Sequence, residues 1–318
     1  MTATTPPRRH LLTGGLAATA AVALPGAARA VLAGTVPAWP ADAPIIGTLG
    51  SYTTREEDTL LDVARRFGLG YTEMIAANRG VDAWLPGAGV KLTLPTAHLL
   101  PDADREGIVL NLADQRLYHF SGGVARVSHA VGIGRQGWST PTGRTEVVEK
   151  KRDPVWRPPD SIREEQPDLP KAVPPGENNP LGHYALYLGW PTYLFHGTNM
   201  PWGIGRRISH GCVRLYPEDI AGFFERVEVG TPVQVVDQPA KLGWVGGTLL
   251  LEVHPSQRQA SQLTETGSFE PAVIGDLPGR VVAKARERDA AIDWPAVDRL
   301  MRERRGVPEP VARPAERS

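Results

Sequence analysis

The chain has 318 residues, 41% of them hydrophobic, a length and composition that suit about two globular domains with appendages. Lys and Arg together number 35, as do Asp and Glu, so the formal net charge is zero. This balance argues for neither an acidic polymer nor a nucleic acid as a partner, and we expect no nucleic-acid binding.

The first 30 residues have the order of a secretory signal. Arg8 and Arg9 precede a mildly apolar run over residues 11–24, and Ala28-Arg29-Ala30 offers a cleavage site after Ala30. The string RRHLL resembles a twin-arginine export signal, although Pro7 and Thr13 depart from that motif. The alternative is a disordered basic start. No later apolar stretch approaches spanning length, so we expect a soluble mature protein.

Residues 50–95 predict a compact strand-helix-helix-strand unit. A strand at 51–53 is followed by one helix that starts after the acids 56–58, by a second helix from Thr72, and by an alternating strand at 90–94. The stretch TLLDVARRFGLGYTEMIAANRGVDAWLPGAGVKLTLP resembles a LysM module, which implies binding to the N-acetylglucosamine-containing glycan of cell walls. Its start, TTREEDTL, departs from the usual Gly-Asp-Thr-Leu, and a spacer with a LysM fold is the alternative.

From residue 107 the sequence becomes strand-rich. Apolar alternation and turn residues predict strands at 108–112, 117–120, 124–131, 185–188, 193–196 and 233–236, with one helix at 217–226. Many short strands with few helices predict a mostly-β sandwich or barrel over 107–237. Residues 151–182 contain eight prolines and little periodicity, which predicts an ordered loop that acts as a lid.

A partly helical C-terminal extension is expected over residues 238–305. It contains a hairpin at 244–253 and helices at 277–292 and 294–305, the second capped by Asp293. Residues 306–318 are rich in Pro, Arg and Glu, so we expect a disordered tail there.

Cys212 is the only cysteine, and it lies in the string FHGTNMPWGIGRRISHGCVRL. Exported cysteines are usually paired, but a lone cysteine has no intramolecular partner, so it is either a buried thiol or a reactive one. A zinc site made of His196, His210 and Cys212 is a further alternative. It lacks the spacing of known zinc motifs.

A reactive thiol needs a base that takes its proton and later returns it to a leaving amine. His210 would share a strand with Cys212, which constrains its approach to the sulfur. His196 ends another expected strand and can face Cys212 across the sheet, so it is the better base. Gly211 lets backbone N–H groups approach an oxyanion, and the Ser209 hydroxyl can support the imidazole network.

Three motifs then resemble one family. The pattern HGT-x₁₀-SHGCVRL, the turn STPTG at 139–143 and the string NPLG at 179–182 occur in the order of the YkuD-like L,D-transpeptidase catalytic domain of the Gram-negative periplasmic branch. The resemblance covers about residues 107–237. It implies that Cys212 is the acylated nucleophile and His196 the general base, oriented by the carbonyl of Gly197.

The same resemblance implies the surrounding roles. Backbone amides of His210, Gly211 and Cys212 would form the oxyanion hole, Arg214 would bind a substrate carboxylate or brace the site, and Thr198 would contact substrate. No metal or organic cofactor is implied, because the cysteine performs the covalent step.

The implied substrate is the tetrapeptide stem of peptidoglycan in the periplasm. Cys212 would attack after the L-centre of meso-diaminopimelate and expel D-alanine, and the acyl group would pass to an amine. A diaminopimelate acceptor gives a 3→3 cross-link, whereas an outer-membrane lipoprotein or another envelope protein becomes anchored to the wall. Two alternatives stay open: an L,D-carboxypeptidase or amidase that gives the acyl group to water, and a non-catalytic wall-binding protein.

Overall fold

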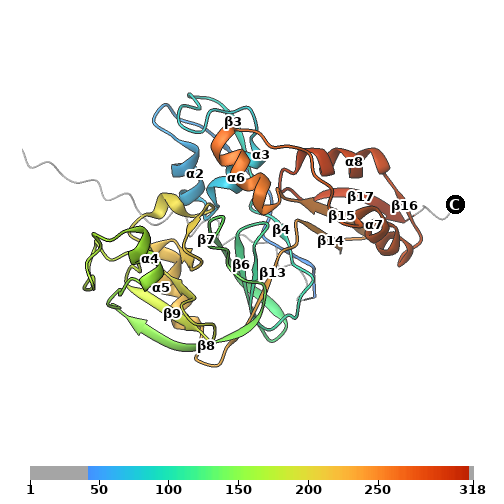
Figure 1. Cartoon of the computed structure of the whole chain (residues 1–318). Coiled ribbons are helices and arrows are strands. Elements are labelled where there is room, and N and C mark those ends of the chain that lie inside the picture. Colours follow the sequence, from blue (N-terminus) through green and yellow to red (C-terminus); the bar gives the residue numbers. More distant parts are fainter. Residues whose placement is uncertain (1–41, 315–318) are drawn as a thin grey trace, which may run out of the picture.

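The computed structural model describes residues 42–314 (Figure 1). The expected signal at 1–30 and the last four residues lie outside this range. The described chain forms a small N-terminal module (residues 50–95), a β-barrel (residues 107–237) and a C-terminal extension (residues 238–314). No helix within 42–314 combines the length and the hydropathy that crossing a membrane requires.

The N-terminal module has the expected βααβ order. It consists of β2 (Gly50–Thr53), α2 (Leu60–Arg66), α3 (Tyr71–Ala77) and β3 (Lys91–Leu94), and β2 pairs antiparallel with β3. The Thr59 hydroxyl accepts a hydrogen bond from the Asp62 amide and so caps α2. Leu60, Met74 and Leu92 are fully buried between the helices and the strands. Beside the module, β1 (Ile45–Ile46) pairs with β4 (His98–Leu99).

The barrel confirms the mostly-β prediction. Its strands are β5 (Gly107–Asn111), β6 (Arg116–Ser121), β7 (Val124–Gly134), β8 (Gly143–Arg152), β9 (Tyr184–Leu188), β10 (Leu194–His196), β11 (Arg207–Ser209), β12 (Val213–Leu215) and β13 (Pro232–Val236). The sheet order is β11-β7-β12-β10-β9-β8-β13-β5-β6. Because β7 also pairs with β6, the sheet closes on itself. Helix α5 (Pro217–Arg226) has the predicted bounds and buries Ile220, Phe223 and Phe224 in the barrel core.

Residues 151–182, named the lid after the role expected for them, have one short helix, α4 (Asp160–Glu165), and one bridge between Trp156 and Val173. Asn179 of the NPLG motif fixes its base and is fully buried. The Asn179 Nδ2 donates to the Pro154 carbonyl at 2.7 Å, and its Oδ1 accepts from the Leu181 amide at 2.9 Å. One buried amide therefore joins the two ends of the lid.

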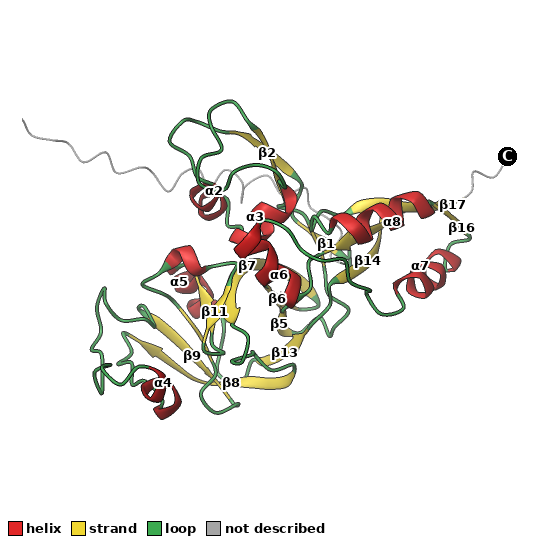
Figure 2. Cartoon of the chain, turned by 45° about the horizontal axis from the view of Figure 1, so that its top comes forward, coloured by secondary structure: helices red, strands yellow, loops and turns green. Residues whose placement is uncertain are grey.

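The C-terminal extension is a second α/β unit. Its strands are β14 (Ala240–Val245), β15 (Thr248–Val253), β16 (Ala290–Ile292) and β17 (Glu309–Pro314), in the order β14-β15-β17-β16. Helices α7 (Leu277–Arg286) and α8 (Trp294–Glu303) pack on this sheet, and Leu277, Val281, Val297 and Leu300 complete its core (Figure 2). The expected hairpin and the Asp293 cap, which accepts from the Ala296 amide, are present.

Two expectations for the C-terminal residues are wrong, and one helix was not predicted. Residues 309–314 are not disordered, because they form β17 between β15 and β16. The helix expected over 277–292 ends at Arg286, and residues 290–292 form β16. Residues 257–266, for which no element was predicted, form α6 (Gln257–Thr266), which lies beside α3 in both views and places Leu263 in the core of the N-terminal module (Figures 1 and 2).

Buried ions connect the three parts. Arg116 of the barrel donates from Nη2 to Glu73 of the N-terminal module at 2.7 Å, and both side chains are 3% exposed. Lys241 of the extension lies 2.7 Å from Asp114 and 2.9 Å from Glu252. Although burial disfavours the charge, these two carboxylates raise the pKa of Lys241. Since the ammonium neutralises the carboxylates, this cluster fits a structural role better than a metal site.

Glycine permits a close backbone contact between the N-terminal module and the barrel. The amides of Tyr71 and Thr72 donate to the carbonyls of Ile204 and Gly205, at 3.2 and 3.0 Å. Gly205 has a φ of +75°, and a Cβ there would lie 2.2 Å from the Tyr71 nitrogen. Only glycine therefore allows this backbone approach.

Candidate active site

Strands β10 and β12 bring the two candidate catalytic residues to neighbouring positions. They run parallel, with Phe195 opposite Val213 and His196 opposite Arg214. Cys212 directly precedes β12, the strand that pairs with the one ending at His196. The parallel register thus gathers His196, Cys212 and Arg214 at one place on the barrel wall.

The environment of Cys212 favours the neutral thiol. The residue is partly exposed, and its Sγ donates to the Thr192 carbonyl at 3.2 Å. Burial raises the pKa of the thiol to about 11, against smaller opposing effects of the Leu194 amide and the Arg214 charge. A base must therefore take the proton as the sulfur attacks.

His196 is placed to be that base. It is 3% exposed, and its Nδ1 lies 2.6 Å from the Gly197 carbonyl oxygen. A carbonyl only accepts, so Nδ1 carries the proton and Nε2 has a free lone pair. Burial and, less strongly, the Arg214 charge lower the pKa of His196 to about 3. The imidazole is therefore neutral at pH 7 and able to accept a proton.

Ser209 and Thr140 hold the loop that carries Cys212. The Ser209 hydroxyl donates to the Cys212 carbonyl at 2.6 Å and accepts from the Gly211 amide at 3.1 Å. Thr140, in the STPTG turn, donates to the Gly211 carbonyl at 2.7 Å and accepts from the Gly134 amide at 3.1 Å. The expectation that Ser209 supports an imidazole is corrected: it braces the backbone. The Gly211 amide is also already engaged, which removes it from the expected oxyanion donors.

His210 occupies a different place from the one expected. It does not share a strand with Cys212, because β11 ends at Ser209 and β12 begins at Val213 on the other side of β7. Its Nε2 lies 3.0 Å from Glu165 Oε2 of the lid and 3.2 Å from Arg135 Nη2. The hydrogen bond with His210, the hydrogen bond from Trp138 and the charge of Arg135 together lower the pKa of the Glu165 carboxyl below its usual value.

Arg214 and Thr198 border the site. Burial lowers the pKa of Arg214, whose buried Nε has no hydrogen-bond partner within residues 42–314. Its charge faces both His196 and Cys212, so it can brace the site electrostatically. Thr198 is buried and accepts from the Met200 amide at 2.9 Å, which shapes the chain before the short helix η1 (Pro201–Gly203).

Thr192 is a residue of the site that the sequence did not indicate. This β-branched residue has a φ of +72°, a region that such residues rarely adopt and that costs about 1–3 kcal/mol. Its carbonyl accepts the hydrogen bond of the catalytic candidate, Cys212. No sequence signal marks such a conformation when the residue is not glycine or asparagine.

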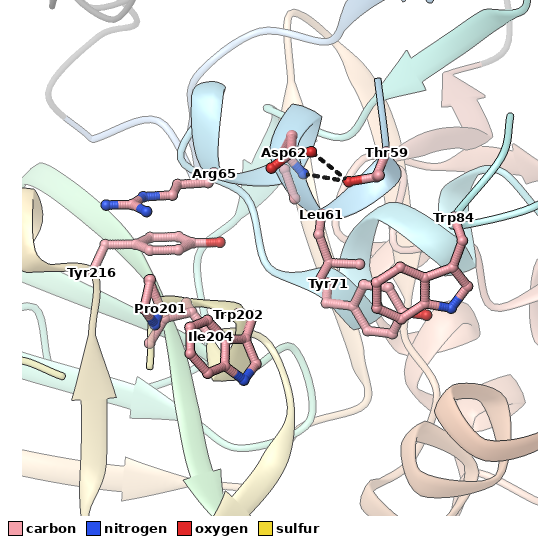
Figure 3. A pocket seen from close by; sticks show the side chains of 11 residues that line it. Thr59, Leu61, Asp62, Arg65, Tyr71, Trp84, Pro201, Trp202, Ile204 and Tyr216 are labelled. Carbon is pink, nitrogen blue, oxygen red and sulfur yellow. Dashed lines mark hydrogen bonds between the residues drawn. The ribbon is translucent and has the colours of Figure 1, made fainter. Parts of the chain in front are cut away.

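A groove of about 240 Å³ lies between the N-terminal module and the barrel (Figure 3). Helix α2 contributes Asp62 and Arg65, while η1 and the chain beside it contribute Trp202 and Ile204. Trp84 and Trp202 border the groove and are both 57% exposed. Exposed apolar surface that is grouped at a groove, and not scattered singly, is typical of binding sites.

Comparison with known proteins shows the family of the chain. The family described as YkuD, L,D-transpeptidase catalytic domain, matches residues 105–235. "Probable L,D-transpeptidase ErfK/SrfK" of Salmonella typhimurium is 40% identical over 253 residues, which cover 77% of this chain and 80% of the relative. "Probable L,D-transpeptidase YcfS" of Escherichia coli is 36% identical over 309 residues, or 93% and 92% of the two chains.

Among solved structures, the L,D-transpeptidase from Mycobacterium smegmatis is 20% identical, with 47% of this chain and 64% of that chain covered and a TM-score of 0.32. The long alignments at 36–40% identity carry the assignment. By this similarity the chain belongs to the L,D-transpeptidase family.

Proposed function

We propose that the chain cleaves and transfers the tetrapeptide stem of peptidoglycan through an acyl-enzyme on Cys212. The parallel pairing of β10 with β12 supports this most directly, because His196, with Nδ1 bonded to the Gly197 carbonyl, ends the strand that pairs with the one directly after Cys212. A neutral thiol next to a neutral imidazole suits proton transfer during attack.

The reaction then runs in two balanced steps. The Cys212 sulfur attacks the carbonyl after the L-centre of diaminopimelate while His196 Nε2 takes the thiol proton. The amides of His210 and Cys212 stabilise the oxyanion, the proton passes to the nitrogen of D-alanine, and a thioester remains. In the second step, an acceptor amine attacks the thioester, His196 takes its proton, and the thiol is regenerated.

The acceptor determines the product. An amine of a second diaminopimelate gives a 3→3 cross-link, and an amine of an outer-membrane lipoprotein or another envelope protein gives anchoring. Water would give an L,D-carboxypeptidase or amidase. The Gram-negative relatives support a periplasmic location for this chemistry.

Mass spectrometry of the protein with a tetrapeptide stem tests this function. Wild type should carry an acyl adduct, Cys212→Ala none, and His196→Ala an adduct that forms much more slowly. His183→Ala is the matched control, because His183 is 60% exposed and bonds Asp153 of the lid. Incubation with a carbapenem should give a one-drug adduct with the same dependence on Cys212. An adduct that persists in Cys212→Ala would refute the nucleophile.

We also propose that the N-terminal module, a LysM-like unit, binds wall glycan at the groove of Figure 3. The two exposed indoles, Trp84 and Trp202, offer apolar faces on which sugar rings can stack. Trp84→Ala and Trp202→Ala should each weaken sedimentation with purified sacculi, while Trp294→Ala, 40% exposed on α8, should not. Turnover of a soluble tetrapeptide should be retained. Unchanged sedimentation in both groove variants would make the module a spacer.

A further inference from the structure

A carboxylate from the lid lies in a ready-made binding site next to the loop that carries Cys212. Glu165, the last residue of α4, places Oε2 2.5 Å from Arg135 Nη2 and 3.0 Å from His210 Nε2. Its Oε1 accepts a hydrogen bond from Trp138 Nε1 at 2.8 Å. Both oxygens are therefore engaged by groups outside the lid.

These three groups are held by the barrel and not by the lid. The Arg135 backbone amide donates to the Ser209 carbonyl at 3.0 Å. The Trp138 ring packs edge-on against His210, with centroids 4.9 Å apart, and the Arg135 guanidinium lies 5.9 Å from the same indole. Because these contacts do not involve Glu165, Arg135, Trp138 and His210 can also receive a carboxylate other than that of Glu165.

The lid end that supplies Glu165 is weakly fixed. Helix α4 has no buried residue and no side-chain cap at its N-terminus. Glu165 itself is 38% exposed. Exposed ion pairs contribute little stability, so a competing carboxylate can displace this one at small cost.

We propose that Arg135, His210 and Trp138 form a binding site for a carboxylate of the donor stem peptide, and that Glu165 occupies it until substrate arrives. The substrate identity rests on the function proposed above. His210 lies two residues before Cys212, so a carboxylate held there is bound by the same loop that carries the reacting thiol. Binding then exchanges one carboxylate for another and releases α4.

Competition sets the expected effect. Glu165 fills the site in part of the molecules, and only the remaining open fraction can bind substrate. The apparent Kd is therefore the intrinsic Kd divided by that open fraction. Glu165→Gln removes the competing charge with almost no change in shape, so it should tighten tetrapeptide binding by about fivefold. Arg135→Gln should weaken binding by about tenfold or more, and Trp138→Phe, which removes only the N–H donor, by about threefold.

Calorimetry on proteins that also carry Cys212→Ala measures binding without turnover. Glu164→Gln is the matched control, since this neighbouring side chain on α4 is exposed and should leave binding unchanged. Unchanged or weaker binding in Glu165→Gln would overturn the proposal, because a bracing role predicts loss and not gain. Absence of tetrapeptide binding in every variant would overturn it equally.

Three amidated peptides identify the carboxylate involved. The tetrapeptide is amidated in turn at D-alanine, at the diaminopimelate side chain and at the glutamyl α-carboxyl. One of these amides should abolish the gain caused by Glu165→Gln, and a gain retained with all three would refute carboxylate exchange. Adduct formation by wild type is scored separately, so a protein that binds in this pattern without acylation would refute the proposed reaction and leave the binding site standing.

Discussion

The alkylation of Cys212 as a function of pH tests how the thiol is activated. With a pKa of about 11, about one Cys212 thiol in 10⁴ is ionised at pH 7, against about one in 10² for the ordinary value of 9.0. The rate of reaction with iodoacetamide should therefore rise about tenfold for each pH unit between 7 and 10.

The same experiment with His196→Ala separates two kinds of Cys–His pair. Because the pKa of His196 is about 3, its imidazole is neutral throughout this pH range and cannot stabilise a thiolate. Removing it should leave the midpoint of the alkylation curve almost unchanged, while acylation by tetrapeptide becomes much slower.

Mass spectrometry reads both reactions at one site, because the chain has no other cysteine. A fast plateau of alkylation between pH 5 and 8 that disappears in His196→Ala would refute our reasoning. It would show a preformed thiolate–imidazolium pair, in which the burial of Cys212 no longer controls its ionisation.

Three further results are expected. Gly205→Ala places a Cβ 2.2 Å from the backbone of the N-terminal module, so the free energy of unfolding measured in urea should fall by about 3 kcal/mol. Gly246→Ala, which lies in open space at φ +53°, should reduce this free energy by less. Equal losses in the two variants would refute the packing explanation. Arg116→Met leaves the Glu73 carboxylate buried and unpaired, so unfolding in urea should become easier by about 3–5 kcal/mol; a neutral result would show that water reaches the carboxylate. The His196 imidazole binds a proton below pH 6.5 in the unfolded chain but only near pH 3 in the folded one. The free energy of unfolding should therefore fall by about 3 kcal/mol as the pH falls from 7 to 4, and His196→Ala should lose this part of the pH dependence.

The sequence predicted the elements whose signals are local. The alternation of Ile108, Leu110 and Leu112 and the apolar face of α5 identify single elements, and each is present within a residue or two. The HGT and SHGC strings marked His196 and Cys212 as the catalytic candidates, and the two residues lie at the end of β10 and directly before β12. Closure of the barrel depends on β7 pairing on both its sides, which no local pattern encodes.

The missed elements have misleading composition. Helix α6 reads QRQASQLTET, and only Gln259, Ala260 and Leu263 are buried, so it lacks a strong apolar period. Strand β17 contains Pro310 and Pro314, which argue against a strand between two others. A register shift opposite Leu249 and Leu250 accommodates Pro310, and this irregularity follows from tertiary packing alone.

The placement of Leu263 in the core of the N-terminal module has a consequence for how such enzymes can be recombined. The residues that fill this core come from segments before and after the barrel in the sequence. Arg305 extends the same arrangement, because its Nη2 donates to the Ala77 carbonyl at 3.0 Å. A recombination point near residue 100 would therefore separate the core residues of the N-terminal module from Leu263, which packs in the same core. Exchange of N-terminal modules between relatives should succeed only when residues 257–305 are exchanged with them.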